Sequence, residues 1–107
     1  MQFNEIRKEL EGIVFDMLRI DSDKYFEAVI VKNELTKLTT RLERLFGSPV
    51  WPSENSLSSE MQETINVFGG IKPGQTLYFW NQGKDTIFAM LWPWQNGLRT
   101  TVKIIQK

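Results

Sequence analysis

The chain has 107 residues, 41% hydrophobic and 24% charged, which is enough for one core and too apolar for a disordered segment. Its 13 basic and 13 acidic residues balance, which argues against a dedicated binder of duplex DNA, because such proteins carry an excess of positive charge. The lack of cysteine and histidine excludes disulfides, thiolate chemistry and catalysis by imidazole. We therefore expect residues 1–107 to form a single domain.

The opening sequence, MQFNEIRKEL, has no basic start followed by an apolar run, so it does not resemble a signal peptide. No stretch of the chain approaches the roughly 18 apolar residues of a membrane helix. We expect a soluble, cytoplasmic protein with no membrane among its partners.

An amphipathic helix is predicted at the N-terminus. Asn4 is a favourable cap, and Glu5 suits the positive end of the helix dipole. The apolar face has alternating steps of three and four residues, and it consists of Phe3, Ile6, Leu10, Ile13 and Met17.

The segment from Ile13 to Val31 has two interpretations. Its two apolar runs, Ile13–Ile20 and Tyr25–Val31, flank the polar sequence DSDK. The second run ends in consecutive β-branched residues, which suit a pleated sheet, so we predict a buried strand at 25–31. The alternative is one helix from Lys24 to Phe46, whose heptad spacing would pair it with the first helix.

Two further helices are predicted. The first begins near Asn33 and ends at Gly47, and its apolar stripe consists of Leu35, Leu38, Leu42 and Leu45. A linker from Ser48 to Ser58 follows, with Trp51 as its anchor. The second helix begins at Ser59, which matches a capping box with Gln62, and it ends at Gly69-Gly70.

The C-terminal part predicts a three-stranded antiparallel meander. Its strands are Thr76–Trp80, Thr86–Trp92 and Leu98–Ile105, and Asn96-Gly97 is a strong hairpin signal between the last two. Together with the strand at 25–31, this pattern predicts an α+β fold in which helices pack on an antiparallel sheet.

The strand register assigns side chains to two faces of this sheet. We place Trp80 opposite Thr86 in the first hairpin and Leu91 opposite Val102 in the second. One face is then typical of a core and collects Leu77, Phe79, Ile87, Ala89, Leu91, Val102 and Ile104. The other face is aromatic with a basic edge and collects Tyr78, Trp80, Phe88, Met90, Trp92, Trp94, Arg99, Thr101 and Lys103.

The aromatic face is the candidate binding surface. Tryptophan, tyrosine and arginine are enriched at the centres of protein interfaces. The predicted contact residues are Tyr78, Trp80, Phe88, Trp92, Trp94, Arg99 and Lys103. The structural alternative is that a helix of the same chain covers Phe88, Met90 and Trp92.

The function predicted from this surface is a non-catalytic protein-interaction or self-associating module, either a homodimer or a complex with another protein. The alternative is binding of single-stranded nucleic acid, with bases stacked on the rings and held by Arg99 and Lys103. Stacking of a sugar on the same rings is a third hypothesis.

No catalytic residue, cofactor or metal site is predicted. Without histidine, a serine nucleophile would need another base, and the carboxylates have no specific spacing.

The sequence GGIKPGQ has the glycines of a phosphate loop but the reverse order of helix and strand. Asp21-Ser22-Asp23 lacks the remainder of a calcium loop. The basic helical face of Lys37, Arg41 and Arg44 is interpreted as dipole compensation and pairing with acids.

Overall fold

Five strands in the order β1-β2-β5-β4-β3 form one antiparallel sheet, and three helices pack against it. The computed structural model describes residues 1–107. In chain order the elements are α1 (Phe3–Glu9), β1 (Met17–Asp21), β2 (Tyr25–Val31), α2 (Lys32–Phe46), α3 (Ser59–Asn66), β3 (Thr76–Gln82), β4 (Asp85–Pro93) and β5 (Arg99–Gln106). The predicted α+β class and the C-terminal meander are confirmed.

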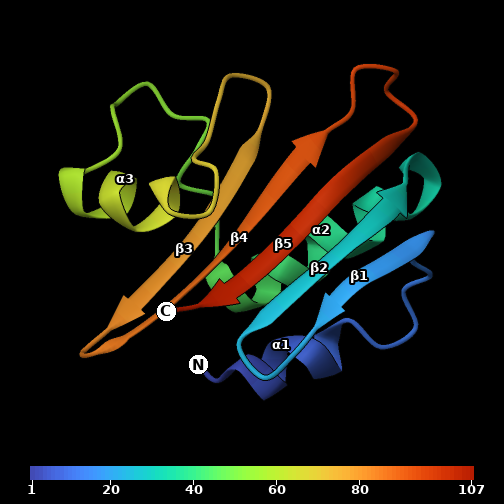
Figure 1. Ribbon diagram of the computed structural model, residues 1–107, viewed down its shortest axis with the longest axis horizontal. Helices are drawn as coiled ribbons and strands as arrows, with labels where there is room; N and C mark the ends of the chain where they lie inside the picture. The colour runs from blue at the N-terminus through green and yellow to red at the C-terminus, as the bar shows by residue number, and fades with distance from the viewer.

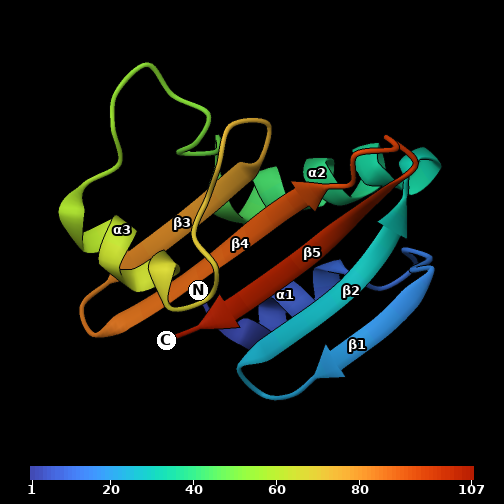
Figure 2. The same ribbon diagram turned by 45° about the horizontal axis from the view of Figure 1, so that its top comes forward.

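The helices lie on opposite sides of the sheet. Helices α1 and α2 cover one face, whereas α3 lies on the other face, beside β3 and β4 (Figures 1 and 2). The main core lies between the sheet and the first two helices; its fully buried members include Ile6, Leu38, Ala89 and Ile104. A second, smaller core lies beneath α3 and consists of Ile65, Leu77, Phe88, Met90 and Ile105.

The predicted strand at 25–31 is confirmed with the same bounds, so the alternative long helix is wrong. β2 pairs with β1 on one side and with β5 on the other. Its side chains are buried at Phe26, Ala28, Val29 and Ile30, because it lies inside the sheet and not at its edge. The β-branched residues therefore occupy the environment that favours them.

The N-terminal helix is shorter than predicted. α1 ends at Glu9, and Met17 begins the edge strand β1 in place of the helix's last turn. The connecting loop is held by Arg41 of α2, whose Nη1 donates hydrogen bonds to the backbone oxygens of Glu9 (2.8 Å) and Glu11. Ile13 is still buried, so the apolar spacing identified core residues correctly but extended the helix too far.

The register of the first hairpin differs from the prediction by one residue. Trp80 lies opposite Ile87 and not opposite Thr86, because Gln82 pairs with Asp85 and only two residues, Gly83 and Lys84, remain in the turn. Gly83 has a φ of 62°, a conformation that a tight hairpin turn requires and that glycine adopts freely. A shift of one residue moves every side chain of β3 to the other face.

The register of the second hairpin is confirmed. Leu91 lies opposite Val102, and Ala89 lies opposite Ile104. The Asn96 side chain accepts a hydrogen bond from the backbone of Leu98 at 2.9 Å and thereby stabilises the turn.

All three predicted caps are displaced by one or two residues. Helix α1 is capped by Gln2, so Asn4 lies inside the helix. Helix α2 begins at Lys32, after Val31, so Asn33 lies inside the helix. Helix α3 is capped by Ser58, whose hydroxyl accepts a hydrogen bond from the Met61 backbone at 3.2 Å, and not by Ser59.

Candidate functional site

Two of the seven predicted contact residues lie on the α1 and α2 face. Tyr78 is 2% exposed, and its ring centroid is 5.9 Å from that of Phe46 on α2. Trp80 is half-buried and packs against the same main core. Their predicted position on the aromatic face is wrong, because the shifted register of β3 exchanges its two faces.

A third predicted residue, Phe88, lies on the expected face but is fully buried. Its ring is 5.6 Å from that of Phe68, which follows α3, and 6.0 Å from Phe79 in a stacked arrangement. The register shift brings Phe79 to this face. The predicted alternative was a helix that covers Phe88, Met90 and Trp92. The structure shows this for Phe88 and Met90, whereas Trp92 packs against the loop that follows α3.

The remaining four predicted residues, Trp92, Trp94, Arg99 and Lys103, lie together where α3 does not reach. Trp94 comes directly after β4, and its indole Nε1 donates a hydrogen bond to Thr101 Oγ1 at 2.9 Å. This contact lays the ring across the neighbouring strand β5. Arg99 Nε is 2.8 Å from the Asp16 carboxylate, so its charge is paired with the segment that precedes β1.

Trp92 and Lys103 form the centre of this group. The Lys103 ammonium lies 3.8 Å from the centroid of the Trp92 ring and is 3.4 Å from the backbone oxygen of Phe68. The indole also packs against Gly69, where an added Cβ would come within 2.5 Å of Trp92 Cη2. The loop after α3 therefore approaches β4 so closely that only glycine fits there.

Glu27, which was not among the predicted contact residues, connects several side chains on this face. Its side chain is only 14% exposed, with Lys103 Nζ at 3.9 Å and Arg19 Nη1 at 3.4 Å. The Tyr25 hydroxyl donates a hydrogen bond to it at 3.0 Å. Burial, the hydrogen bond to Glu27 and the negative charge of Glu27 raise the pKa of Tyr25 to about 12. In the sequence, Glu27 is the only charged residue in the run Tyr25–Val31, and this feature could have identified it as a candidate site residue.

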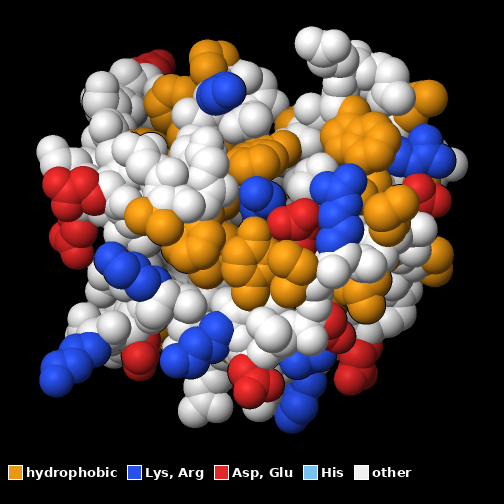
Figure 3. All heavy atoms as spheres, in the orientation of Figure 1, with side chains coloured by type: hydrophobic (Ala, Val, Ile, Leu, Met, Phe, Trp, Pro, Cys, Tyr) orange, Lys and Arg blue, Asp and Glu red, His pale blue; other side chains and the backbone are white.

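We call the region of the α3-side sheet face formed by β1, β2 and β5 the open half, because no helix lies over it (Figure 1). Its side chains shield one another, and Val29 at its centre is 0% exposed. In Figure 3 apolar side chains appear here among basic and acidic ones, with no large area of one charge. The open half therefore has an apolar interior beneath a neutral network of paired charges.

The edge of the open half is apolar and exposed. β1 carries Met17 (51% exposed), Leu18 (57%) and Ile20 (41%), which are three of the six large hydrophobic residues that the whole chain exposes. β1 pairs with β2 alone, so the outer side of its backbone has no strand beside it. A break in register between Leu18 and Ile20 marks a β-bulge around Arg19.

The basic residues of α2 pair with acidic residues of the same chain. On α2, Lys37 pairs with Glu34 at 3.1 Å and Arg44 with Glu9 at 3.8 Å, in agreement with the predicted pairing of this basic face. The pKa of Glu34 is lowered, chiefly by the hydrogen bond from Lys37. No three acidic side chains lie close enough together to hold a metal ion.

No model of a protein family, no curated protein and no solved structure matched this chain in three separate comparisons. None of the three helices combines the length and the apolar composition needed to cross a bilayer.

Proposed function

We propose that this chain is a self-associating module, in which two copies meet through β1 and the adjoining open half. The observation that carries the proposal is the exposure of Met17 and Ile20, which lie opposite Val29 and Glu27 and therefore face the open half. Leu18, also exposed on this strand, lies opposite Ala28 and faces the side of α1 and α2. Burial of exposed apolar side chains is favourable by about 25 cal/mol per Å², before the costs of association are subtracted.

The charges around β1 favour a second copy as the partner. Asp16, Arg19 and Asp21 each lie beside an opposite charge of the same chain, namely Arg99, Glu27 and Arg7. The surface around β1 therefore presents apolar side chains and no unpaired charge. Two copies can bring this surface together without placing like charges opposite each other. The net charge of zero also removes long-range repulsion between two copies.

The bulge in β1 determines the type of contact that we expect. A bulge interrupts the regular backbone spacing that another strand would need, and proteins use bulges to protect sheet edges from continuous pairing. We therefore propose packing of side chains across the interface, without a hydrogen-bonded ladder that joins the two sheets.

The contact is small, so the dimer should be weak. Three strands are about 14 Å wide and β2 is about 23 Å long, which gives a footprint of roughly 320 Å². Stable complexes bury about 800 Å² per partner. We therefore expect a dimer that dissociates on dilution.

The test is molar mass in solution, measured by sedimentation equilibrium over a wide range of concentrations. The double variant Met17→Lys with Ile20→Lys should remain monomeric where the unaltered chain dimerises. Val67→Lys is the matched control, because Val67 is also an exposed apolar residue (79%) but follows α3, outside the open half. A dimer that survives the double variant, or a monomer at every concentration of the unaltered chain, would contradict the proposal.

Binding of single-stranded nucleic acid stays a prediction, and no feature of the site favours it. Tyr78 and Phe88 are buried on opposite faces, and Arg99 and Lys103 both lie near carboxylates. A chain that remains monomeric should be titrated with a mixed oligonucleotide at low salt, with tryptophan emission as the signal.

A further inference from the structure

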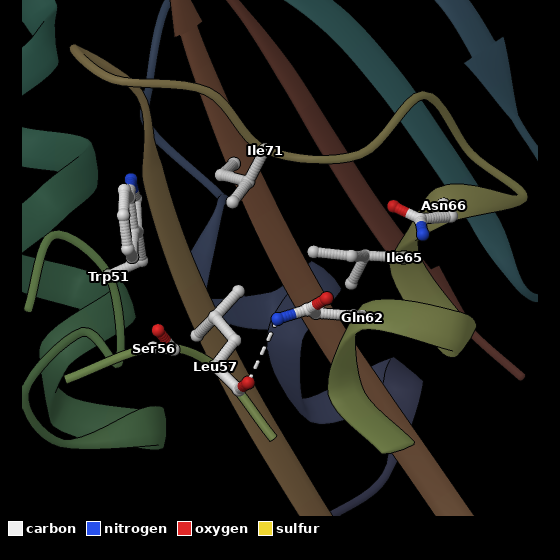
Figure 4. Close-up of a pocket in the computed structure, with 7 residues that line it drawn as sticks. All are labelled: Trp51, Ser56, Leu57, Gln62, Ile65, Asn66 and Ile71. Atoms are coloured by element: carbon white, nitrogen blue, oxygen red, sulfur yellow. Dashed lines mark hydrogen bonds between the residues drawn. The ribbon is translucent and has the colours of Figure 1, made fainter. Parts of the chain in front are cut away.

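A pocket of about 290 Å³ lies between α3, the linker that precedes it and the loop that follows it. It is on the α3 side of the sheet beside β3, whereas the open half is at β1, β2 and β5 (Figure 1). Figure 4 shows its lining, to which each of these three segments contributes side chains. The pocket is therefore separate from the proposed dimer surface.

One wall of the pocket is the indole of Trp51, which is fixed at its backbone and at its ring. Leu77 of β3 donates a backbone hydrogen bond to the Trp51 oxygen at 3.0 Å, so this part of the linker pairs with the sheet edge. The indole Nε1 donates to the Lys72 oxygen at 3.4 Å. In Figure 4 the ring is seen edge-on, so one flat face is turned toward the aliphatic side chains of Leu57 and Ile71.

The opposite wall is formed by α3 and carries carboxamides. Gln62 Nε2 donates to the Leu57 oxygen at 2.9 Å, which fixes this carboxamide and leaves its Oε1 as an acceptor. The Asn66 carboxamide, one turn further along α3, has no hydrogen-bond partner within the chain and offers both a donor and an acceptor. Ile65, which is 1% exposed, forms the apolar floor between them.

No charged side chain lines the pocket. A phosphate, carboxylate or ammonium group would find no opposite charge in this lining, so a neutral ligand fits it better. The volume is at the lower end of the roughly 300–1,000 Å³ of ligand sites, so it suits one or two rings.

We propose that this pocket binds a small, neutral, planar heteroaromatic molecule that carries an amide or lactam group. Its ring would lie against the flat face of Trp51, since aromatic rings prefer offset stacking. Its amide group would donate a hydrogen bond to the Asn66 carboxamide and accept one from it. No charged side chain of the pocket would contact the ligand. The flat indole of Trp51 matches the ring of such a ligand, and the uncharged carboxamides of α3 match its amide.

The test uses nicotinamide as the probe and two-dimensional ¹H–¹⁵N NMR as the readout. Signals of the Trp51 indole N–H and of the Gln62 and Asn66 carboxamides should shift in a saturable manner, while the indole signals of Trp80 and Trp94 stay unchanged. Nicotinate has the same ring with a negative charge, and cyclohexanecarboxamide has the same amide without a flat ring. Both should bind at least tenfold more weakly.

Variants of α3 complete the test without disturbing the core. Asn66→Asp places a charge in the pocket and should weaken nicotinamide binding at least tenfold. Glu63→Gln changes an exposed residue of the same helix that does not line the pocket, and it should leave binding unchanged. The proposal is overturned if nicotinamide causes no saturable shift at these signals, if Asn66→Asp binds it equally well, or if the non-planar amide binds as tightly.

Discussion

The ammonium group of Lys103 lies 3.8 Å from the ring centroid of Trp92 and 3.9 Å from the carboxylate of Glu27. The Lys103 side chain is only 15% exposed, so its charge is largely withdrawn from water and depends on these two neighbours. A cation above a tryptophan ring is stabilised most where it is desolvated. This contact joins β2, β4 and β5 on the face that α3 covers only in part.

Replacing Lys103 with methionine should lower the free energy of unfolding by about 1–2 kcal/mol, because the cation–π contact is lost while the volume is retained. Urea denaturation followed by tryptophan fluorescence measures the change. Lys107→Met, at an exposed position, is the control and should have almost no effect. Equal stability of the two variants would show that the Lys103 contact contributes nothing.

Gly69 should be far more sensitive to alanine than Gly74. Both have a positive φ, 109° and 85°, so each substitution carries the backbone cost of about 1–2 kcal/mol. At Gly69 the new Cβ also meets Trp92 at 2.5 Å, whereas at Gly74 nothing lies within 4 Å. We expect Gly69→Ala to be the more destabilising by about 1–3 kcal/mol in urea denaturation. A similar loss at both positions would mean that Trp92 moves aside without cost.

Arg41→Lys should destabilise the fold, although it conserves the charge. The guanidinium donates to the backbone oxygens of both Glu9 and Glu11, and a single ammonium group cannot reproduce this geometry. We expect a loss of about 1–2 kcal/mol, measured by thermal or urea unfolding. Arg44→Lys is the control, since its ion pair at 3.8 Å is exposed and should contribute almost nothing. The prediction fails if the two substitutions have the same effect.

The two tyrosines should both titrate well above the ordinary value of 10. Burial and the nearby charge of Glu43 raise the pKa of Tyr78 to about 12, as burial and Glu27 do for Tyr25. A raised pKa stabilises the neutral form in the folded state, so this contribution to stability is complete below pH 10 and is lost as the pH rises through 12. Absorbance of tyrosinate, recorded in the native and the urea-unfolded chain, measures both values because the chain has no other tyrosine. If both tyrosines of the folded chain titrated near pH 10, the burial and the carboxylate contacts described for Tyr25 and Tyr78 would be wrong.

Local sequence signals determined several elements of the fold. The β-branched end of Tyr25–Val31 specified a strand with the same bounds, and Asn96-Gly97 specified the register between β4 and β5. The leucine stripe identified α2, and Gly47 its end. These features were predictable because each depends on residues that are close in the chain, such as a turn or one helical face.

The tertiary structure decided which residues share a surface. The run Ile13–Ile20 is apolar enough for either a helix or a strand, and only its pairing with β2 makes Met17–Asp21 a strand. Alternation along β3 showed that Tyr78 and Trp80 share a face, but the two-residue turn at Gly83 and Lys84 placed that face against α1 and α2. A shift of one residue in register reverses the faces of a whole strand, because side chains alternate with a period of two. The sequence by itself therefore determined the elements other than β1, and the long-range register determined the candidate site.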